Sequence, residues 1–518
     1  MDNLGNKRIA KNTAILYVRL IFTMLIGLYT SRLILKNLGV NDFGIYNVVG
    51  GVVSMFAVVS SSLSAAISRF LTFKLGQNDI DGLRLAFSTS VFIQFLLCLI
   101  IVILAEPIGL WFMHNKMTIP LGRIPAAEWV FHFSLVTFCL DLINVPYRSL
   151  IIAHERMGVY SYLSIFEVAA KLLVVVVLVV APIDRLVFYS LLLVLVSLVS
   201  RIVYGIYCSR NFIECKINFV FDKTFFRQMF SFAGWNFIGA IASVLRDAGG
   251  NVVINLFYPP AVNAARGISI QVRSAVCSFS SNFITAINPP ITKSFAKGET
   301  DYTFSLVFSG AKWSFYLLYM LALPVLINTH YILSIWLGIV PEYTVVFVRL
   351  ILLLSLVDII SETLITLMLA TGNIRNYQIV VGGLVLLNLP LSYMFLKLGF
   401  EPQVVFIVSI LISMICIVVR VGMLKLMVEL PVKRFLKEVL MKIIIVSFIS
   451  FSVPFIISFY IEESFGLFVL SCLVCLLSTI LGVGLLGMTN SEKEILKSVV
   501  RNKIISKITA VPFRNHRA

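Results

Sequence analysis

The sequence has few charged residues and few histidines. Of its 518 residues, 13% are charged and 59% are hydrophobic. Apolar surface on this scale exceeds what a single soluble core can bury, so the composition excludes an ordinary soluble protein. The five histidines are dispersed, and the sequence has no His-x-x-x-His pair and no Gly-Lys-Ser/Thr phosphate-binding motif. We therefore expect a protein that is not an enzyme and that needs no metal or cofactor.

Cysteines are also few, and they are scattered through apolar runs and short loops. This distribution argues against a disulfide framework. Cys472 and Cys475 have the spacing of a redox or metal-binding pair, but they lie inside an apolar run without histidine or acidic neighbours. We interpret them as packing residues.

Long apolar runs dominate the sequence and predict helices that cross a membrane. A spanning helix needs about 20 mostly apolar residues, whereas the strands of a membrane barrel alternate apolar and polar side chains. The runs here are continuous and predict an all-α polytopic membrane protein. About fourteen spans are expected, at 13–36, 43–70, 85–105, 128–151, 159–181, 186–208, 229–256, 262–288, 304–327, 344–370, 377–398, 403–424, 440–460 and 465–487.

The eighth of these spans, 262–288, has the lowest hydropathy because it contains two arginines and several amides. Charge asymmetry supports it nevertheless. With fourteen spans, basic residues concentrate on the side of both termini, which the positive-inside rule assigns to the cytoplasm. The net charge of +17 is then explained by topology and by attraction to anionic lipid headgroups, with no need for nucleic-acid binding.

An internal repeat divides the chain. The segment Ala153–Tyr160 is similar to Ala370–Tyr377 at an offset of 217 residues, and Ser60–Ile67 is similar to Ser280–Ile287 at an offset of 220. This spacing predicts two lobes of six spans each, related by an axis along the membrane normal. The expected division is an N-terminal lobe (1–222), a C-terminal lobe (223–430), two further spans (431–490) and a basic cytoplasmic tail (491–518).

Small and polar residues form a stripe on the seventh span. Because they recur at steps of three or four, they share one helix face, which either lines a cavity or packs closely on a neighbour. Arg246 is followed at once by Asp247, so ion pairing with another helix is the alternative to ligand binding. The stripe consists of Asn236, Gly239, Ser243, Arg246 and Gly250.

Four other arginines lie at span depth, where a charge usually faces a partner or a water-filled cavity. Arg266 and Arg273 are seven residues apart and share a face of the eighth span, which indicates an anion. Arg19 and Arg32 in the first span point about 140° apart on a straight helix. Both can face one cavity only if the helix bends, for which Gly27 is the expected place.

Acidic residues form polar stripes in two further spans. The fourth span carries Asp141 and Arg148 on one face, and the tenth carries Asp358 and Glu362. Such stripes either clasp neighbouring helices or act in gating and ion coupling. Both roles remain open at this stage.

Short motifs at a consistent order and spacing give the chain a family resemblance. They are Leu-Gly-Val-Asn-Asp-Phe-Gly-Ile-Tyr at 38–46, Ser-Arg-Phe at 68–70 and the turn at 153–160. With them the chain resembles the polysaccharide-transporter branch of the MOP superfamily. This branch includes the O-antigen and capsule repeat-unit flippases called Wzx and, more distantly, the lipid II flippases and the MATE exporters.

The resemblance implies a flippase of the bacterial inner membrane. Such a protein moves an undecaprenyl-pyrophosphate-linked oligosaccharide by alternating access, for O-antigen, capsule or exopolysaccharide synthesis. Its partners would be this lipid-linked oligosaccharide, membrane lipids, and a polymerase or glycosyltransferases of the same pathway. By matching position the resemblance points to Arg19, Arg32, Arg266 and Arg273 as pyrophosphate ligands, to which the stripe argument adds Arg246.

Two other functions remain open. A MATE-like cation-coupled multidrug antiporter would use Asp247, Asp358 and Glu362 for coupling, but the excess of arginines would repel cationic drugs and favours the flippase. A non-transporting membrane scaffold would need a partner-binding domain. The basic tail is too short to supply one.

Overall fold

The computed structural model describes residues 3–54, 57–115, 120–181, 184–215, 222–458, 464–489 and 492–494. Within these ranges every element is helical. Twelve of the helices are long and apolar enough to cross a membrane. The chain is therefore a multi-pass all-α membrane protein, as the sequence predicts. The expected count of fourteen spans is not confirmed, because α2 (Ala57–Gly76) and α8 (Pro260–Ala296) are not among the twelve.

The first two helices differ from the predicted spans. Helix α1 runs from Asn3 to Ser54 and contains a break at Gly39, whose φ of 77° suits a residue without a side chain. This break lies beyond both arginines of the helix, and the predicted bend at Gly27 stays a prediction. The predicted span 43–70 corresponds to the end of α1 and most of α2.

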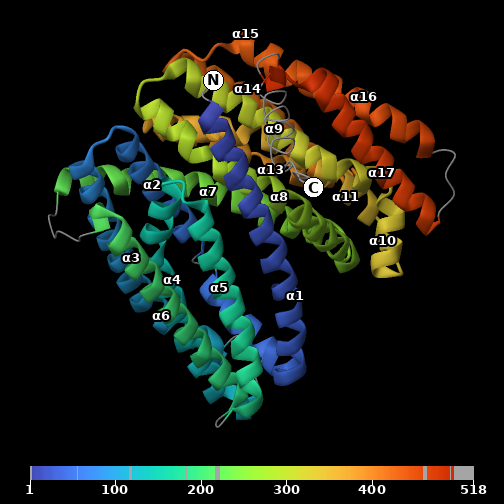
Figure 1. Ribbon diagram of the computed structural model, residues 1–518. Helices are drawn as coiled ribbons and strands as arrows, with labels where there is room; N and C mark the ends of the chain where they lie inside the picture. Colours follow the sequence, from blue (N-terminus) through green and yellow to red (C-terminus); the bar gives the residue numbers. More distant parts are fainter. Residues whose placement is uncertain are drawn as a thin grey trace, which may run out of the picture.

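Helices α1 to α6 form what we call the N-terminal bundle, which ends with a short turn at Cys215. Helix α1 lies along α5, and α4 packs against α6 (Figure 1). The bounds of the remaining helices are α3, Ile80–Asn115; α4, Ile124–Ala153; α5, Met157–Val177; and α6, Arg185–Asn211.

Helices α7 to α14 form the C-terminal bundle. The short helix α10 was not expected, and the predicted span 377–398 is divided at Leu387 into α12 and α13. The bounds are α7, Lys223–Phe257; α9, Thr300–Ile327; α10, Thr329–Leu337; α11, Thr344–Thr371; α12, Arg375–Leu386; α13, Asn388–Lys397; and α14, Val404–Val428.

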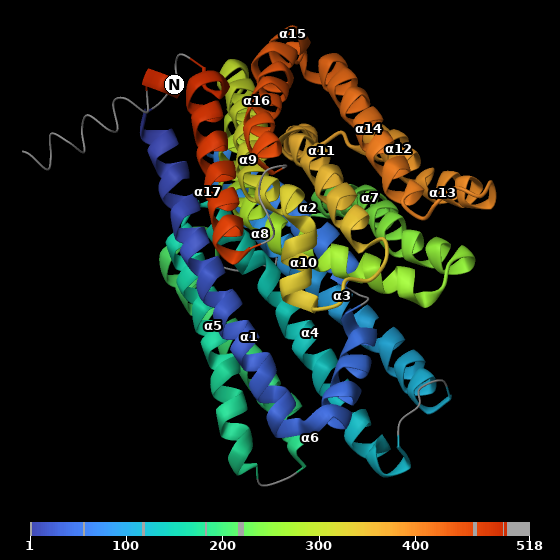
Figure 2. The ribbon, with the colours of Figure 1, turned by 90° about the vertical axis from the view of Figure 1, so that its right-hand side faces the viewer.

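The last helices pair with each other at the edge of the C-terminal bundle. Helix α15 (Val432–Phe435) leads through a π-helical turn into α16 (Met441–Ser458), and α17 (Phe465–Gly482) ends in a second π-helical turn. Helices α16 and α17 pack on each other and on α9 (Figure 2).

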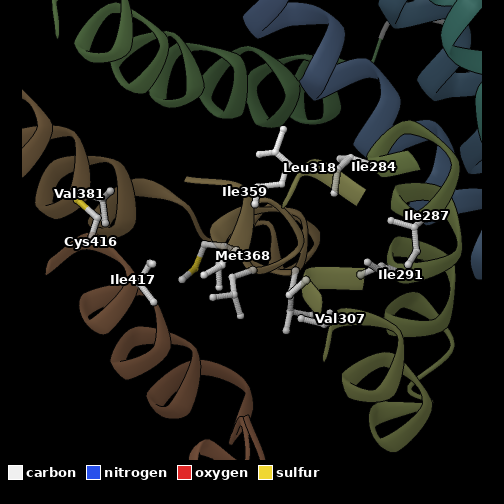
Figure 3. Packing of buried hydrophobic residues seen from close by; sticks show 14 of the residues in the cluster. Ile284, Ile287, Ile291, Val307, Leu318, Ile359, Met368, Val381, Cys416 and Ile417 are labelled. Atoms are coloured by element: carbon white, nitrogen blue, oxygen red, sulfur yellow. The ribbon is translucent and has the colours of Figure 1, made fainter. Parts of the chain in front are cut away.

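The largest core lies around α8, α9 and α11 (Figure 3). Isoleucines of α8 meet apolar residues of α9 and α11 there. The approach is closest at Gly310 of α9, where an added Cβ would lie 2.8 Å from both Ile287 Cδ1 and Thr363 Cγ2. Thr363 also donates a hydrogen bond to the Val307 carbonyl, at 2.9 Å. The absence of a side chain at Gly310 thus lets the three helices meet.

The two bundles meet on the side of the molecule where α1 begins and where α2, α4, α8 and α11 end. We call this side the N-side. There α2 packs against α7 and α8, and α1 packs against α8. The ends of α2 and α8 approach so closely that a Cβ on Gly76 would lie 2.9 Å from Lys293 Cα.

At the opposite side of the N-terminal bundle, an arginine ties three helices together. Arg123, just before α4, donates from Nε to Asp42 Oδ1 of α1 at 2.9 Å and also pairs with Asp184. Asp184 caps α6 by accepting from the backbone N–H of Leu186. Burial raises the pKa of Asp184, but Arg123 and the helix N–H groups lower it more, so the net shift is downward. The motif at 38–46 thus supplies a structural contact.

The contact at Gly310 generates a stability prediction. Gly310→Ala should destabilise the protein by about 1–3 kcal/mol, because its methyl group must displace Ile287 or Thr363. Gly383→Ala in α12 is the matched control, since nothing lies within 4 Å of its added Cβ and alanine favours a helix by about 1 kcal/mol. Thermal unfolding in detergent should separate the two variants. Equal melting temperatures would contradict the packing argument.

Candidate functional site

Three of the five arginines predicted to bind pyrophosphate lie together, with two aspartates, in the C-terminal bundle. Arg246 of α7 lies 3.1 Å from Asp247 and 3.5 Å from Asp358 of α11, measured between nitrogen and oxygen. Arg273 of α8 lies 3.6 Å from Asp247 and 4.0 Å from Asp358. Together with Arg266 of α8, these residues form a set that we call the central cluster.

Arg266 is the most buried arginine of the central cluster. Its Nη2 donates to the Asp247 carbonyl at 2.7 Å, and its guanidinium lies over the Phe406 ring. Its Nε and Nη1 are buried and have no hydrogen-bond partner. Gly250 of α7 makes room for it, because a Cβ there would lie 2.5 Å from Nη1. Arg266 therefore has N–H donors that no protein group satisfies.

The residues of the α7 stripe make different contacts along the helix. Near its beginning, Asn236 donates to the Ser62 carbonyl of α2 at 3.1 Å and accepts from Gln378 of α12. Gly239 lies against Gln378 as well. Farther along, Arg246 and Gly250 face the central cluster. The first part of the stripe is thus a packing surface, and its later part contributes to the charged cluster. That the stripe lines a cavity stays a prediction.

The central cluster carries one more positive than negative charge, from three arginines and two aspartates. Ion pairs at span depth are favourable only when each group has partners, and an excess cation is costly in a membrane. The Asp247 side chain is 50% exposed, whereas that of Arg246 is 13% exposed. The cluster is therefore accessible on the Asp247 side.

Further polar contacts join Asp358 and its neighbours on α11 to α14. Ser413 of α14 donates to Asp358 Oδ1 at 2.7 Å, which fixes the carboxylate. Arg420 of α14 donates to Tyr377 and Ser361 at 3.2 and 3.0 Å. Glu362 lies one helical turn from Asp358 on α11. Sequence reasoning missed Arg420, although an arginine inside the apolar run 404–428 is itself a signal.

The acidic stripe of the N-terminal bundle forms a separate and balanced cluster. Arg148 lies 2.9 Å from Glu167 and 4.0 Å from Asp141, and Lys171 lies 3.3 Å from Glu167. Arg148 also lies over the Tyr204 ring. Two acids and two bases pair with each other between α4 and α5, which is the arrangement of an inter-helix clasp.

The two arginines of α1 are not part of the central cluster. Arg19 donates to Asn282 of α8 at 2.8 Å and lies over the Tyr160 ring. Asn282 is nine residues from Arg273, which is about 14 Å along a helix. Arg19 thus joins the two bundles closer to the N-side. The side chain of Arg32 lies outside the described residues.

A carboxylate on the N-side connects the bundles. Glu155, in the turn between α4 and α5, lies 3.1 Å from Arg8 of α1 and 2.7 Å from Lys293 of α8. Its side chain is 9% exposed. Asn12 of α1 also donates to the backbone carbonyl of Glu155. Charge-assisted bonds to a nearly buried carboxylate are among the stronger polar contacts in proteins.

The equivalent turn of the C-terminal bundle follows α11, and a residue of the N-terminal bundle contacts it. Arg69 of α2 donates to the Ala370 carbonyl at 3.0 Å and lies over the Phe70, Phe73 and Phe232 rings. Thus Lys293 of the C-terminal bundle contacts the turn after α4, and Arg69 of the N-terminal bundle contacts the turn after α11. We call Arg8, Arg69, Glu155, Lys293 and the Ala370 carbonyl the N-side clamp.

The turns of the N-side clamp share a backbone conformation at the repeat spacing. Glu155 has a φ of 57° and Gly372 a φ of 79°, and they are 217 residues apart. Asn78 and Gly298, after α2 and α8, also have positive φ and are 220 residues apart. These are the two offsets seen in the sequence.

The described helices form two bundles that meet on the N-side, and the C-terminal bundle holds the central cluster. The chain belongs to the polysaccharide biosynthesis protein family, which matches residues 9–295. The resemblance to the polysaccharide branch of the MOP superfamily is thereby confirmed. No curated protein matches the sequence.

Solved structures with this fold are MATE transporters and other members of the MOP superfamily. A MATE protein in its bent conformation is similar with a TM-score of 0.70 and 9% identity, over 80% of this chain and 94% of that chain. The MATE transporter ClbM, in complex with Rb⁺, gives 0.67 and 14%, over 80% and 93%. A MOP transporter from Pyrococcus furiosus, described as having a binding pocket of reverse polarity, gives 0.67 and 10%, over 80% and 94%.

The N-side clamp can be tested with a buried reporter. Ala286 of α8 is fully buried against Leu16 and Met157 where the bundles meet. In a chain without native cysteines, Ala286→Cys should react slowly with a water-soluble thiol reagent. Adding Glu155→Gln should raise the rate about fivefold if the clamp loses about 1 kcal/mol.

Arg156→Gln is the control for that experiment. Arg156 is adjacent in sequence but donates to Tyr207 and Asn211 within the N-terminal bundle. It should leave the labelling rate unchanged. Equal rates for Glu155→Gln and Arg156→Gln would show that Glu155 does not hold the bundles together.

Proposed function

We propose that this protein is a membrane transporter, a flippase for lipid-linked oligosaccharides, and that its central cluster binds the pyrophosphate of the carrier lipid. The observation that carries the proposal is the convergence of Arg246, Arg266 and Arg273 with unpaired donors on Arg266. Forked guanidinium groups bind phosphate oxygens in pairs, and a low dielectric strengthens the attraction. The cargo would be an undecaprenyl-pyrophosphate-linked repeat unit.

Binding would proceed by exchange of anions. In the structure Asp247 and Asp358 neutralise two of the three arginine charges. A pyrophosphate diester brings two negative charges to the same donors. It would displace the more exposed Asp247 carboxylate first and leave Asp358, which Ser413 holds in place. Asp358 and Glu362 would then be available for ion coupling.

Transport would follow from opening the N-side clamp. We place the N-side in the cytoplasm of a bacterium and the protein in its inner membrane. This orientation is supported by the basic residues of the N-side, which include Arg8, Lys74, Arg156 and Lys293. The structure then represents a state closed toward the cytoplasm. Loading of cargo made by glycosyltransferases would require Glu155 to release Lys293.

The flippase proposal predicts loss of export on removal of the arginines. In a strain that lacks its own flippase, the double variant Arg266→Ala, Arg273→Ala should abolish surface glycan. The single variant Arg273→Lys keeps the charge but loses the forked geometry, so it should reduce export partially. Arg349→Ala is the control, because Arg349 bonds Thr329 away from the central cluster.

Protein level in the membrane and melting temperature must be matched between the variants. Normal surface glycan in the double variant would disprove the anion site. A cation exporter is the competing function, since the fold is shared with MATE proteins. Drug resistance that the chain confers and that Asp358→Asn abolishes would reverse the assignment.

A further inference from the structure

A polar cavity lies on the N-side, away from the central cluster. It has a volume of about 150 Å³ and is lined by α9, α15, the π-helical turn before α16 and Thr489, which follows α17. At about 30 Å³ per water, it has room for a phosphate group. Its polar lining consists of Ser305, Ser309 and Lys312 of α9, Arg434, Glu438 and Thr489.

Cations dominate the surroundings of this cavity. Lys312 is 2% exposed and pairs with Glu492 at 2.5 Å. Arg434 donates to Glu438 and to Ser305, both at 3.0 Å, and its guanidinium group has five N–H donors in all. Burial raises the pKa of Glu492, but Lys312 and Thr489 lower it more, so its net shift is downward and it stays ionised.

Lys442 adds a third cation beside these groups. It donates to the Met488 carbonyl at 2.7 Å, which ties the beginning of α16 to the end of α17. Lys312, Arg434 and Lys442 thus face two carboxylates, those of Glu438 and Glu492. The balance is one net positive charge, so the cavity attracts an anion.

The cavity lies in the N-side half of the spanning helices. Arg434 and Glu438 lie in the first two turns of the apolar span 432–457, and Thr489 lies just beyond the end of the span 465–487. Both spans change to π-helical turns there, at Leu436–Leu440 and Val483–Gly487. Such turns are rare and are frequent at functional sites.

Exposed apolar side chains lie close in sequence to the cavity residues. Leu436 and Met441 are exposed on one helix, and Leu485 and Leu486 are exposed on the other, by 43–69%. These residues lie within or beside the π-helical turns. A polar cavity with a cationic wall and an adjacent apolar surface matches a molecule with an anionic head and hydrocarbon chains.

We propose that this cavity binds the phosphate of an anionic glycerophospholipid in the N-side leaflet. The acyl chains would lie along the exposed leucines and Met441. Arg434 would donate to the phosphate, and Lys312 with its partner Glu492 would set the depth of the headgroup. The site would attach the α16–α17 pair to the lipid and is separate from the transport path through the central cluster.

The test uses the purified full-length chain in a neutral detergent. Phosphatidylglycerol or phosphatidylcholine is titrated in, and bound lipid is counted by native mass spectrometry. Phosphatidylglycerol should bind more tightly. Arg434→Gln should weaken its binding about tenfold, because one charge-assisted hydrogen bond is lost. Lys433→Gln removes a neighbouring charge that does not line the cavity and should keep normal binding.

A cavity-filling variant and a competition with inorganic phosphate test the proposal further. Ser305→Leu fills the cavity without changing charge and should also weaken phosphatidylglycerol binding. Inorganic phosphate should not compete if the acyl chains contribute, so competition at millimolar phosphate would assign the site to a free anion and overturn the lipid proposal. Equal phosphatidylglycerol binding by the wild type, Arg434→Gln and Ser305→Leu would overturn it as well.

Discussion

A charge inside a membrane-spanning helix needs a partner, because lipid offers neither water nor counterions. The described helices meet this constraint in two ways. In the N-terminal bundle, Arg148 and Lys171 are matched in number by Asp141 and Glu167, so the group is neutral. In the central cluster the arginines outnumber the aspartates, and Arg266 keeps two buried nitrogens without acceptors. A neutral cluster holds helices together, whereas an excess cation favours a ligand of opposite charge. The binding role proposed for the central cluster rests on this difference in net charge.

The sequence predicted the fold well because apolar runs and charge asymmetry are properties of single residues and their neighbours. It failed where a helix depends on distant contacts. Helix α8 is polar because it packs on both bundles and carries Arg266 and Arg273. Hydropathy alone therefore does not identify it as a spanning helix. The break at Gly39 was missed because the positive φ depends on the geometry of the turn, and Gly27 has the same chemistry in a regular helix.

Part of the candidate site could be predicted because the spacing of residues within one helix shows which of them share a face. This spacing placed Arg266 beside Arg273 and Arg246 near Asp247. The pairing of Arg246 with Asp358 joins α7 to α11, and no periodicity within one helix contains that contact. Glu155 escaped notice because it lies in a short polar turn, where an acidic residue is ordinary. Its role depends on Lys293, which is 138 residues away.

The two turns of the N-side clamp show how a repeat can keep its shape and change its chemistry. Both need a residue with positive φ, which costs about 1–2 kcal/mol for a residue with a side chain and little for glycine. The C-terminal turn has Gly372, and a Cβ there would lie 2.6 Å from Arg69 Nη2, so glycine is required for the arginine to reach Ala370. The N-terminal turn instead accepts the strain of Glu155 and gains a carboxylate that binds Arg8 and Lys293. One turn thus contributes a backbone carbonyl and the other a side chain. Because the charged carboxylate can bind another cation in place of Arg8 or Lys293 while the backbone carbonyl carries no net charge, Glu155 is the half of the clamp that a high salt concentration can weaken.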